Sequence, residues 1–139
     1  MKQYEFLEHT ADVKFRAYGK TLEEAFSNAA LATSAVMTDV KKIKGKIEKT
    51  IAVQSKTKES LLYDFLEKLL YLLDTESFIA SKVKSLKIKK GKAFKLIATV
   101  IGDNADGYDV HPYIKAVTYN DMLIKEEKGK VTIQVVHDI

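Results

Sequence analysis

Two acidic side chains near opposite ends of the sequence could take part in the same chemistry. Asp12 follows His9-Thr10-Ala11 in a short interruption between two strand-like runs, and Asp138 stands directly before the last residue, Ile139. If the apolar run that ends at Ile139 pairs beside the first two runs, the two aspartates and the α-carboxylate of Ile139 converge. Such oxygen ligands suit hard cations, namely calcium, magnesium or manganese. The residues therefore indicate a divalent-cation site, and exposed turn carboxylates are the alternative.

The histidines offer a second kind of ligand. His9, His111 and His137 lie in three separate segments, and none has the spacing of a helical metal-binding pair. We expect His137 to point to the opposite face of its strand from Asp138, because side chains alternate along a strand. His9 is the better candidate to support Asp12, and the same pair would supply the base and ligand if the protein were a metal hydrolase.

A polar connection over residues 102–107 also contains acids. Asp103, Asp106 and Asp109 invite a calcium-loop interpretation, but the spacing and the closing glutamate of an EF-hand are missing, so we expect a solvated loop. The sequence contains no phosphate-binding GxxxxGK[ST] motif, dinucleotide glycine fingerprint or nucleophile elbow. These omissions favour a binding or accessory protein over an enzyme.

Composition limits the organisation of the chain. With 139 residues, 46% of them hydrophobic, residues 1–139 are expected to form a single domain. No apolar stretch is long enough to cross a membrane, and the N-terminal residues lack the apolar core of a secretory signal, so we expect a soluble cytoplasmic protein. The absence of cysteine excludes disulfides and thiolate zinc sites.

Lysine dominates the basic residues. The formal net charge is +4, and Arg16 is the only arginine. Lysines cluster over residues 41–49 and 82–95. Lysine is a hydrated point charge without the planar fork that reads bases, so each cluster is either a solvated face or a surface for RNA or an acidic protein.

Apolar periodicity predicts two helices, over about residues 21–38 and 57–75. The first opens with Thr21-Leu22-Glu23-Glu24, which has the pattern of a capping box, and then repeats apolar residues every three or four positions. The second has a wide, leucine-rich face, which is typical of a central core helix; a partner-binding helix is the alternative.

Alternating residues predict strands for most of the remaining chain. Runs at 4–7, 13–18, 46–54, 83–88, 93–101, 114–119 and 131–136 alternate apolar and polar residues or are strongly apolar, and the short gaps at 89–92 and 127–130 are typical of hairpin turns. The predicted fold is therefore α+β, with two helices packed on a mainly antiparallel sheet.

Several phrases of the sequence resemble the archease family. They are His9 to Gly19, Thr21 to Phe26, Ala29 to Ala32, Met37-Thr38-Asp39, Lys115 to Tyr119, and the terminal Val135-Val136-His137-Asp138-Ile139. The chain departs from the family pattern at Asn120, where archeases often have histidine, and in the shorter stretch Tyr108 to Tyr113.

The resemblance implies an accessory protein rather than an enzyme. Archeases activate the RNA ligase of tRNA splicing by promoting its guanylylation and repeated turnover, and a chaperone-like effect on a tRNA methyltransferase or its tRNA has been proposed. The metal site of the family maps onto Asp12, Asp138 and Ile139, the set that the residues also indicate. The alternative function is an RNA- or tRNA-binding, chaperone-like module that modulates tRNA methylation through the lysine clusters.

Overall fold

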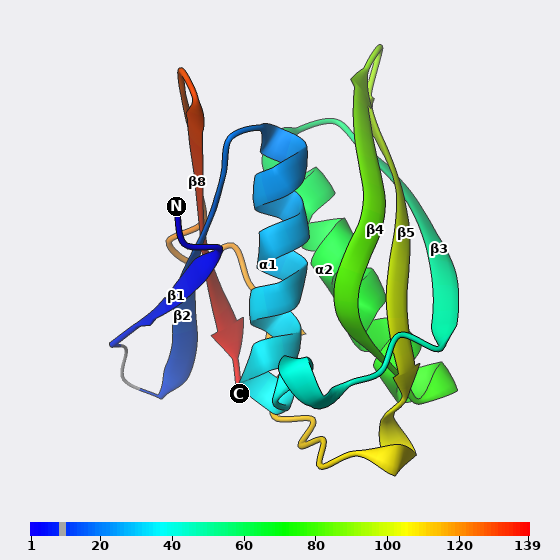
Figure 1. Ribbon diagram of the computed structural model, residues 1–139. Coiled ribbons are helices and arrows are strands. Elements are labelled where there is room, and N and C mark those ends of the chain that lie inside the picture. The colour runs from blue at the N-terminus through cyan, green and yellow to red at the C-terminus, as the bar shows by residue number, and fades with distance from the viewer. Residues whose placement is uncertain (9–10) are drawn as a thin grey trace.

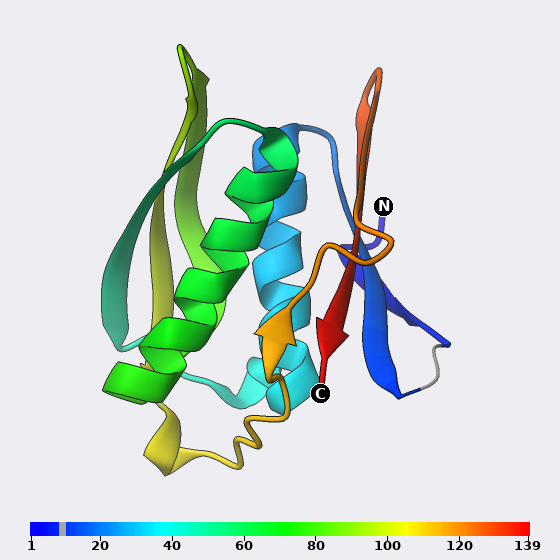
Figure 2. The same ribbon diagram turned by 180° about the vertical axis from the view of Figure 1, so that it is seen from behind.

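Two helices lie between two β-sheets (Figures 1 and 2). The computed structural model describes residues 1–8 and 11–139. The helices are α1 (Leu22–Met37) and α2 (Lys58–Glu76), with short 3-10 turns η1 (Val40–Lys42) and η2 (Ala105–Gly107). The strands are β1 (Tyr4–Leu7), β2 (Asp12–Gly19), β3 (Ile47–Ser55), β4 (Phe78–Lys90), β5 (Phe94–Asn104), β6 (Ala116–Val117), β7 (Leu123–Glu127) and β8 (Lys130–Asp138).

Neighbouring strands in both sheets run antiparallel. The first sheet has the order β1-β2-β8-β6, with β7 also paired to β8, and the second has the order β3-β5-β4. The α+β class and the mainly antiparallel pairing predicted from the sequence are confirmed. The strands form two sheets rather than one because the helices present apolar residues on opposite sides, and each sheet covers one side.

Both helices begin close to their predicted starts, with Thr21 and Thr57 as their N-caps. The Thr21 hydroxyl accepts a hydrogen bond from the Glu24 amide at 3.1 Å, but the Glu24 carboxylate accepts from the Lys20 amide rather than from that of Thr21. The predicted capping box at α1 is therefore half formed and its second bond lies one residue earlier. At the start of α2, Thr57 and Ser60 form the complete reciprocal pair.

The core lies between the helices and the two sheets. Phe26 of α1 and Phe65 of α2 stack with their ring centroids 6.3 Å apart, and both are fully buried. The small residues of α1 let this helix approach both sheets; they are Ala25, Ala29 and Ala32. The leucine-rich face of α2 is buried, which confirms the assignment of α2 as a core helix; its buried leucines include Leu61, Leu62, Leu66 and Leu69. Within the described residues, neither helix combines the length and apolar character needed to cross a membrane.

Three predicted segments have other bounds in the structure, and β7 is a strand that the sequence analysis did not predict. Strand β4 begins at Phe78 rather than Val83, because Ser77 adopts the left-handed conformation and turns the chain directly out of α2. The predicted polar loop 102–107 is the end of β5 followed by η2, since Gly102 lies against the Ile79–Ala80 backbone too closely for any side chain. The predicted strand 114–119 is reduced to β6, because beyond Val117 a Thr118 side chain rather than the backbone bonds to β8.

Candidate metal site

Asp12 and Asp138 lie directly opposite each other. Asp12 is the first residue of β2 and Asp138 the last of β8, and the antiparallel register pairs them. Opposed residues in an antiparallel pair point to the same face of the sheet with Cβ atoms about 5 Å apart. The structure thus brings together two acids that are 126 positions apart in the sequence.

The alternation of the two strands sets the direction of each side chain. Val13 and His137 form the next pair in the register, and His137 is fully buried beneath the sheet. The aspartates must therefore point to the opposite, outer face, where Asp138 is exposed and Asp12 is half-buried. The expected opposition of His137 and Asp138 is observed.

The end of β8 is held from its other side by β6. Ala116 pairs with Asp138, and the Lys115 amide donates to the Asp138 carbonyl oxygen at 2.7 Å. Ile139 follows directly and is 40% exposed, so its main-chain oxygens lie one residue from the paired aspartates. The local oxygen donors match the ligands of a hard divalent cation, and β2 and β6 both restrain the strand that carries them.

His137 supports this end of the strand from inside. Its Nε2 lies 3.0 Å from the Thr33 hydroxyl on α1, and that hydroxyl donates to the Ala29 carbonyl oxygen. The Thr33 lone pair is then left to accept from Nε2–H of a neutral imidazole. Burial lowers the pKa of His137 from 6.5 to about 4, so the ring is neutral near pH 7.

The contact between Thr33 and His137 was not foreseen from the sequence. The sequence places Thr33 on the buried stripe of the first helix and His137 in an apolar strand. Two buried polar side chains each require a hydrogen-bond partner, and this requirement was the signal that could have indicated their contact. We infer that the pair is structural: it links the C-terminal end of β8 to α1, and the His137 ring is not one of the proposed cation ligands.

The other candidate ligands do not join this site. His111 contacts Asp109 at 2.8 Å on the surface, and Asp103 accepts from the Tyr108 hydroxyl at 2.6 Å, which lowers the Asp103 pKa. Asp103 and Asp109 thus have separate partners, and the calcium-loop interpretation gains no support. His9, predicted to support Asp12, lies outside the described residues.

Side chains alone would not define the proposed set. Among residues 1–8 and 11–139, no three His, Cys, Asp or Glu side chains gather as a metal cluster. The set predicted here contains two acidic side chains, Asp12 and Asp138, and its third member, Ile139, contributes main-chain oxygen. A cation would therefore complete its coordination with water or with groups of a partner.

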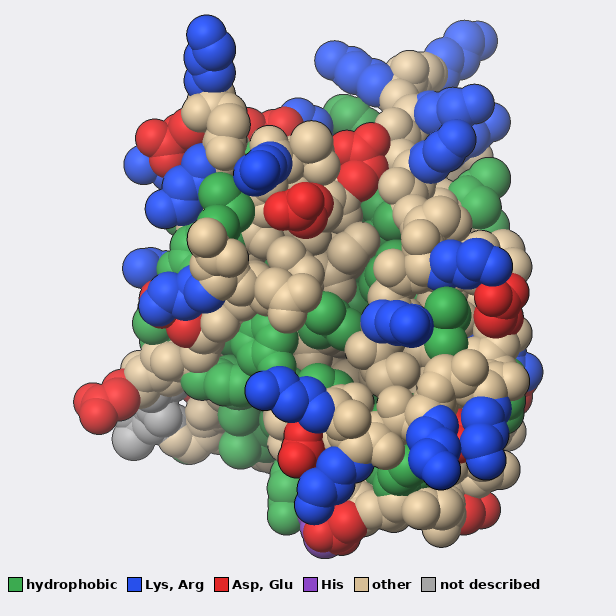
Figure 3. All heavy atoms as spheres, in the orientation of Figure 1, with side chains coloured by type: hydrophobic (Ala, Val, Ile, Leu, Met, Phe, Trp, Pro, Cys, Tyr) green, Lys and Arg blue, Asp and Glu red, His purple; other side chains and the backbone are tan. Residues whose placement is uncertain are grey.

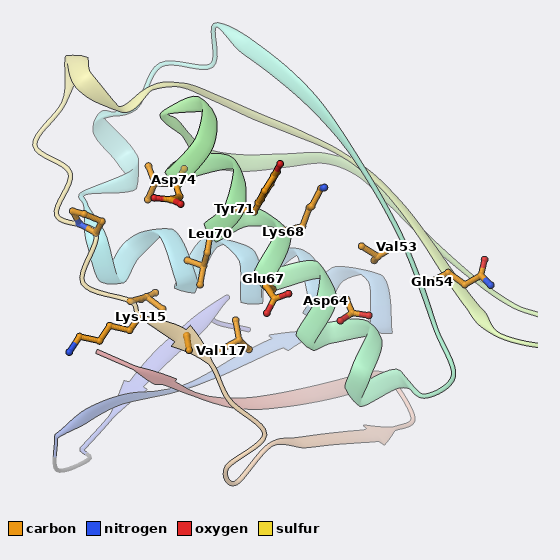
Figure 4. Close-up of a pocket in the computed structure, with 14 residues that line it drawn as sticks. Val53, Gln54, Asp64, Glu67, Lys68, Leu70, Tyr71, Asp74, Lys115 and Val117 are labelled. Carbon is orange, nitrogen blue, oxygen red and sulfur yellow. The ribbon is translucent and has the colours of Figure 1, made fainter.

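An open groove of about 850 Å³ lies between α2 and the segment that contains β6 (Figure 4). Helix α2 forms one wall, with Asp64, Glu67 and Asp74, and the segment with Lys115 and Val117 forms the other. Because the Lys115 amide bonds to Asp138, this groove and the paired aspartates share one structural element. A partner that contacts the groove would also reach the end of β8.

The fold and the paired strand ends define a small α+β protein in which two helices lie between two antiparallel sheets and two aspartates oppose each other at the ends of β2 and β8. The sequence matches the archease protein family (MTH1598/TM1083) over residues 4–139. It is also 40% identical over 141 residues to an archease of Methanosarcina mazei, covering 99% of this chain and 97% of that protein. The chain belongs to the archease family, as its resemblance predicted.

Solved structures have the same fold. The solution structure of Methanobacterium thermoautotrophicum protein 1598 matches with a TM-score of 0.84 and 38% identity, and each chain is covered completely. A crystal structure of a Thermotoga maritima archease, described as a possible chaperone, matches with a TM-score of 0.58 and 20% identity over 96% of this chain and 94% of that one. The second likeness concerns the fold alone.

Proposed function

We propose that this archease is an accessory protein that activates the tRNA-splicing RNA ligase by promoting its guanylylation and multiple turnover. Family membership supports the general role. The observation that supports the site is the direct opposition of Asp12 and Asp138 at the end of β8. The proposal assigns the activating role to this edge and the transfer chemistry to the ligase.

We further propose that Asp12, Asp138 and Ile139 hold a divalent cation, with calcium, magnesium and manganese as the candidates. Two carboxylates held on neighbouring strands repel each other, and a divalent ion relieves that repulsion. Bound there, the ion would supply positive charge for phosphate groups at an interface. The chain's own contribution is to hold the oxygen donors on a restrained strand end that a partner can reach.

A guanylylation assay of the cognate ligase tests the proposal. The ligase is incubated with labelled GTP alone, with the wild-type archease, or with an Asp138→Asn variant. We expect strong stimulation by the wild type and loss of most of it in the variant. Asp106→Asn is the matched control, because Asp106 is an exposed acid on η2 with the same charge. Full stimulation by Asp138→Asn together with a folded protein would contradict the assigned site.

The second candidate function is an RNA- or tRNA-binding, chaperone-like module that modulates tRNA methylation. The lysine-rich β4–β5 hairpin favours it, since that charge has no role in cation binding. Methylation of tRNA by a partner methyltransferase, measured with and without this protein, separates the candidates. A change in methylation specificity with no effect on ligase guanylylation would replace the first proposal with this one.

A further inference from the structure

The β4–β5 hairpin has a strongly unbalanced charge. Residues 81–101 contain no Asp or Glu and seven lysines, all exposed: Lys82, Lys84, Lys87, Lys89, Lys90, Lys92 and Lys95. Figures 1 and 2 show the hairpin extending past the ends of both helices, and Figure 3 shows basic side chains gathered at its tip. Nearly a third of the basic residues of the chain therefore project from a single element.

Protein carboxylates neutralise little of this charge. Within the described residues, Lys84 alone of the seven makes an ion pair, with Glu48 of β3 at 2.9 Å. Lys90 lies 5.9 Å above the Phe94 ring, and that contact keeps its charge. The remaining lysines present their ammonium groups to solvent or to a ligand.

The register places three of these lysines, Lys87, Lys89 and Lys95, on one face. Lys89 lies directly opposite Lys95, and Lys87 lies opposite Ile97, which is 59% exposed. Leu96 on the other face is fully buried against the helices. Lys87, Lys89, Lys95 and Ile97 therefore form an open surface, here called the hairpin face. Like charges directly opposite on neighbouring strands destabilise a sheet, so an anion between Lys89 and Lys95 would relieve a cost built into the fold.

We propose that the hairpin face binds the sugar-phosphate backbone of RNA. Successive lysines on one face of a strand are about 7 Å apart, and this repeated positive charge suits a polymer with regularly spaced phosphates. Lysines without an arginine fork contact phosphates rather than bases, so binding is independent of sequence. The turn, Lys89 to Lys92, contains no large apolar side chain that could insert into a membrane.

The position of the hairpin face allows RNA and the ligase to be bound at the same time. Figures 1 and 2 place the β4–β5 turn at the opposite end of the molecule from the C-terminus. RNA on the hairpin face therefore leaves the end of β8 and the adjoining groove open to the ligase. The choice of RNA over other polyanions rests on the proposed function, whereas the location of the anion-binding face rests on charge and register.

Anisotropy titrations of a labelled tRNA transcript with the isolated protein test the inference. The test variant combines Lys87→Gln, Lys89→Gln and Lys95→Gln. The matched control combines Lys41→Gln, Lys42→Gln and Lys44→Gln, which removes the same charge from exposed lysines in and beside η1. Glutamine keeps the length and polarity of these exposed side chains, and circular dichroism melting checks that both variants fold.

We expect the wild type to bind tRNA with a steep salt dependence. The hairpin variant should bind at least about tenfold more weakly, with a logarithmic salt slope shallower by about 2 to 3, because three phosphate contacts are lost. The control should bind within about twofold of the wild type. Equal weakening in both variants, unchanged binding in the hairpin variant, or no binding by the wild type at low salt would overturn the inference.

The ligase assay separates this inference from the proposed function. Loss of guanylylation in Asp138→Asn, with tRNA binding intact, leaves the two roles on separate ends of the molecule as proposed. If the hairpin variant binds tRNA like the wild type but no longer stimulates guanylylation, the hairpin face contacts the ligase and the assignment to RNA is wrong. If the wild type binds tRNA as expected but does not stimulate the ligase, the proposed function fails while the hairpin face stands.

Discussion

The buried bond between Thr33 and His137 should contribute measurably to stability. Thr33 is 1% exposed and His137 is fully buried, and their side chains lie 3.0 Å apart. Replacing Thr33 with Val keeps the shape of the side chain but removes the hydroxyl that accepts from Nε2–H. The imidazole N–H is then left in the core without that partner.

The size of the effect follows from burial. A buried donor left unsatisfied costs about 1 to 3 kcal/mol, and the isosteric change opens no cavity, so we expect Thr33→Val to lower the free energy of unfolding by about 2 kcal/mol. In a His137→Leu background the same change should cost about 1 kcal/mol less, because no N–H remains to be stranded.

Urea unfolding in the presence of a chelator measures this cost without a contribution from bound cation. Thr75→Val is the matched control: Thr75 of α2 makes the same type of bond to the carbonyl oxygen four residues earlier, at 2.7 Å to Tyr71, but is exposed. If Thr33→Val and Thr75→Val agree to within about 0.5 kcal/mol, the bond does not secure β8 and the reasoning fails.

Three further results are expected. His137 has a pKa of 6.5 in the unfolded chain and of about 4 when folded, so the unfolded state takes up the proton first as pH falls. About 3 kcal/mol of stability that is present above the unfolded pKa should therefore be lost as pH falls through this window. Urea unfolding of chelator-treated protein across the window should show this loss, and a His137→Gln variant should not show it. A Cβ at Gly102 would lie 1.9 Å from the Ile79 carbonyl oxygen, so Gly102→Ala should lower the free energy of unfolding by about 3 kcal/mol or prevent folding. A Cβ at Gly107 would lie in open space, so Gly107→Ala should change that free energy by less than about 0.5 kcal/mol in the same assay. Calcium at about one hundred times its dissociation constant should stabilise the wild type by about 3 kcal/mol in a thermal melt, and the gain should disappear in Asp138→Asn; equal gains in both would place the ion elsewhere.

The sequence predicts the helices well because their signals are local. Thr21 and Thr57 mark the starts of α1 and α2, and the apolar repeat determines which face each helix buries. Strand ends are less certain because they depend on distant partners. The early start of β4 at Phe78 requires the left-handed Ser77, which has no sequence signature of its own.

The pairing of Asp12 with Asp138 shows where sequence reasoning reaches its limit. Residue types and strand pattern made their convergence a hypothesis, but the register could not be derived, and a slip of one residue would have turned Asp138 to the buried face. The division of the strands into two sheets could not be derived from the sequence either. It depends on how α1 packs between β2 and β4, which the periodicity of one helix does not specify.

The most direct test is a calorimetric titration of calcium, magnesium and manganese chlorides into chelator-treated protein. One ion should bind per chain of the wild type and of Asp106→Asn, and binding should be lost or weakened at least about tenfold in Asp12→Asn and in Asp138→Asn. Unchanged binding in both of these variants, or no binding of any of the three cations by the wild type, would contradict the assignment of the site to Asp12, Asp138 and Ile139.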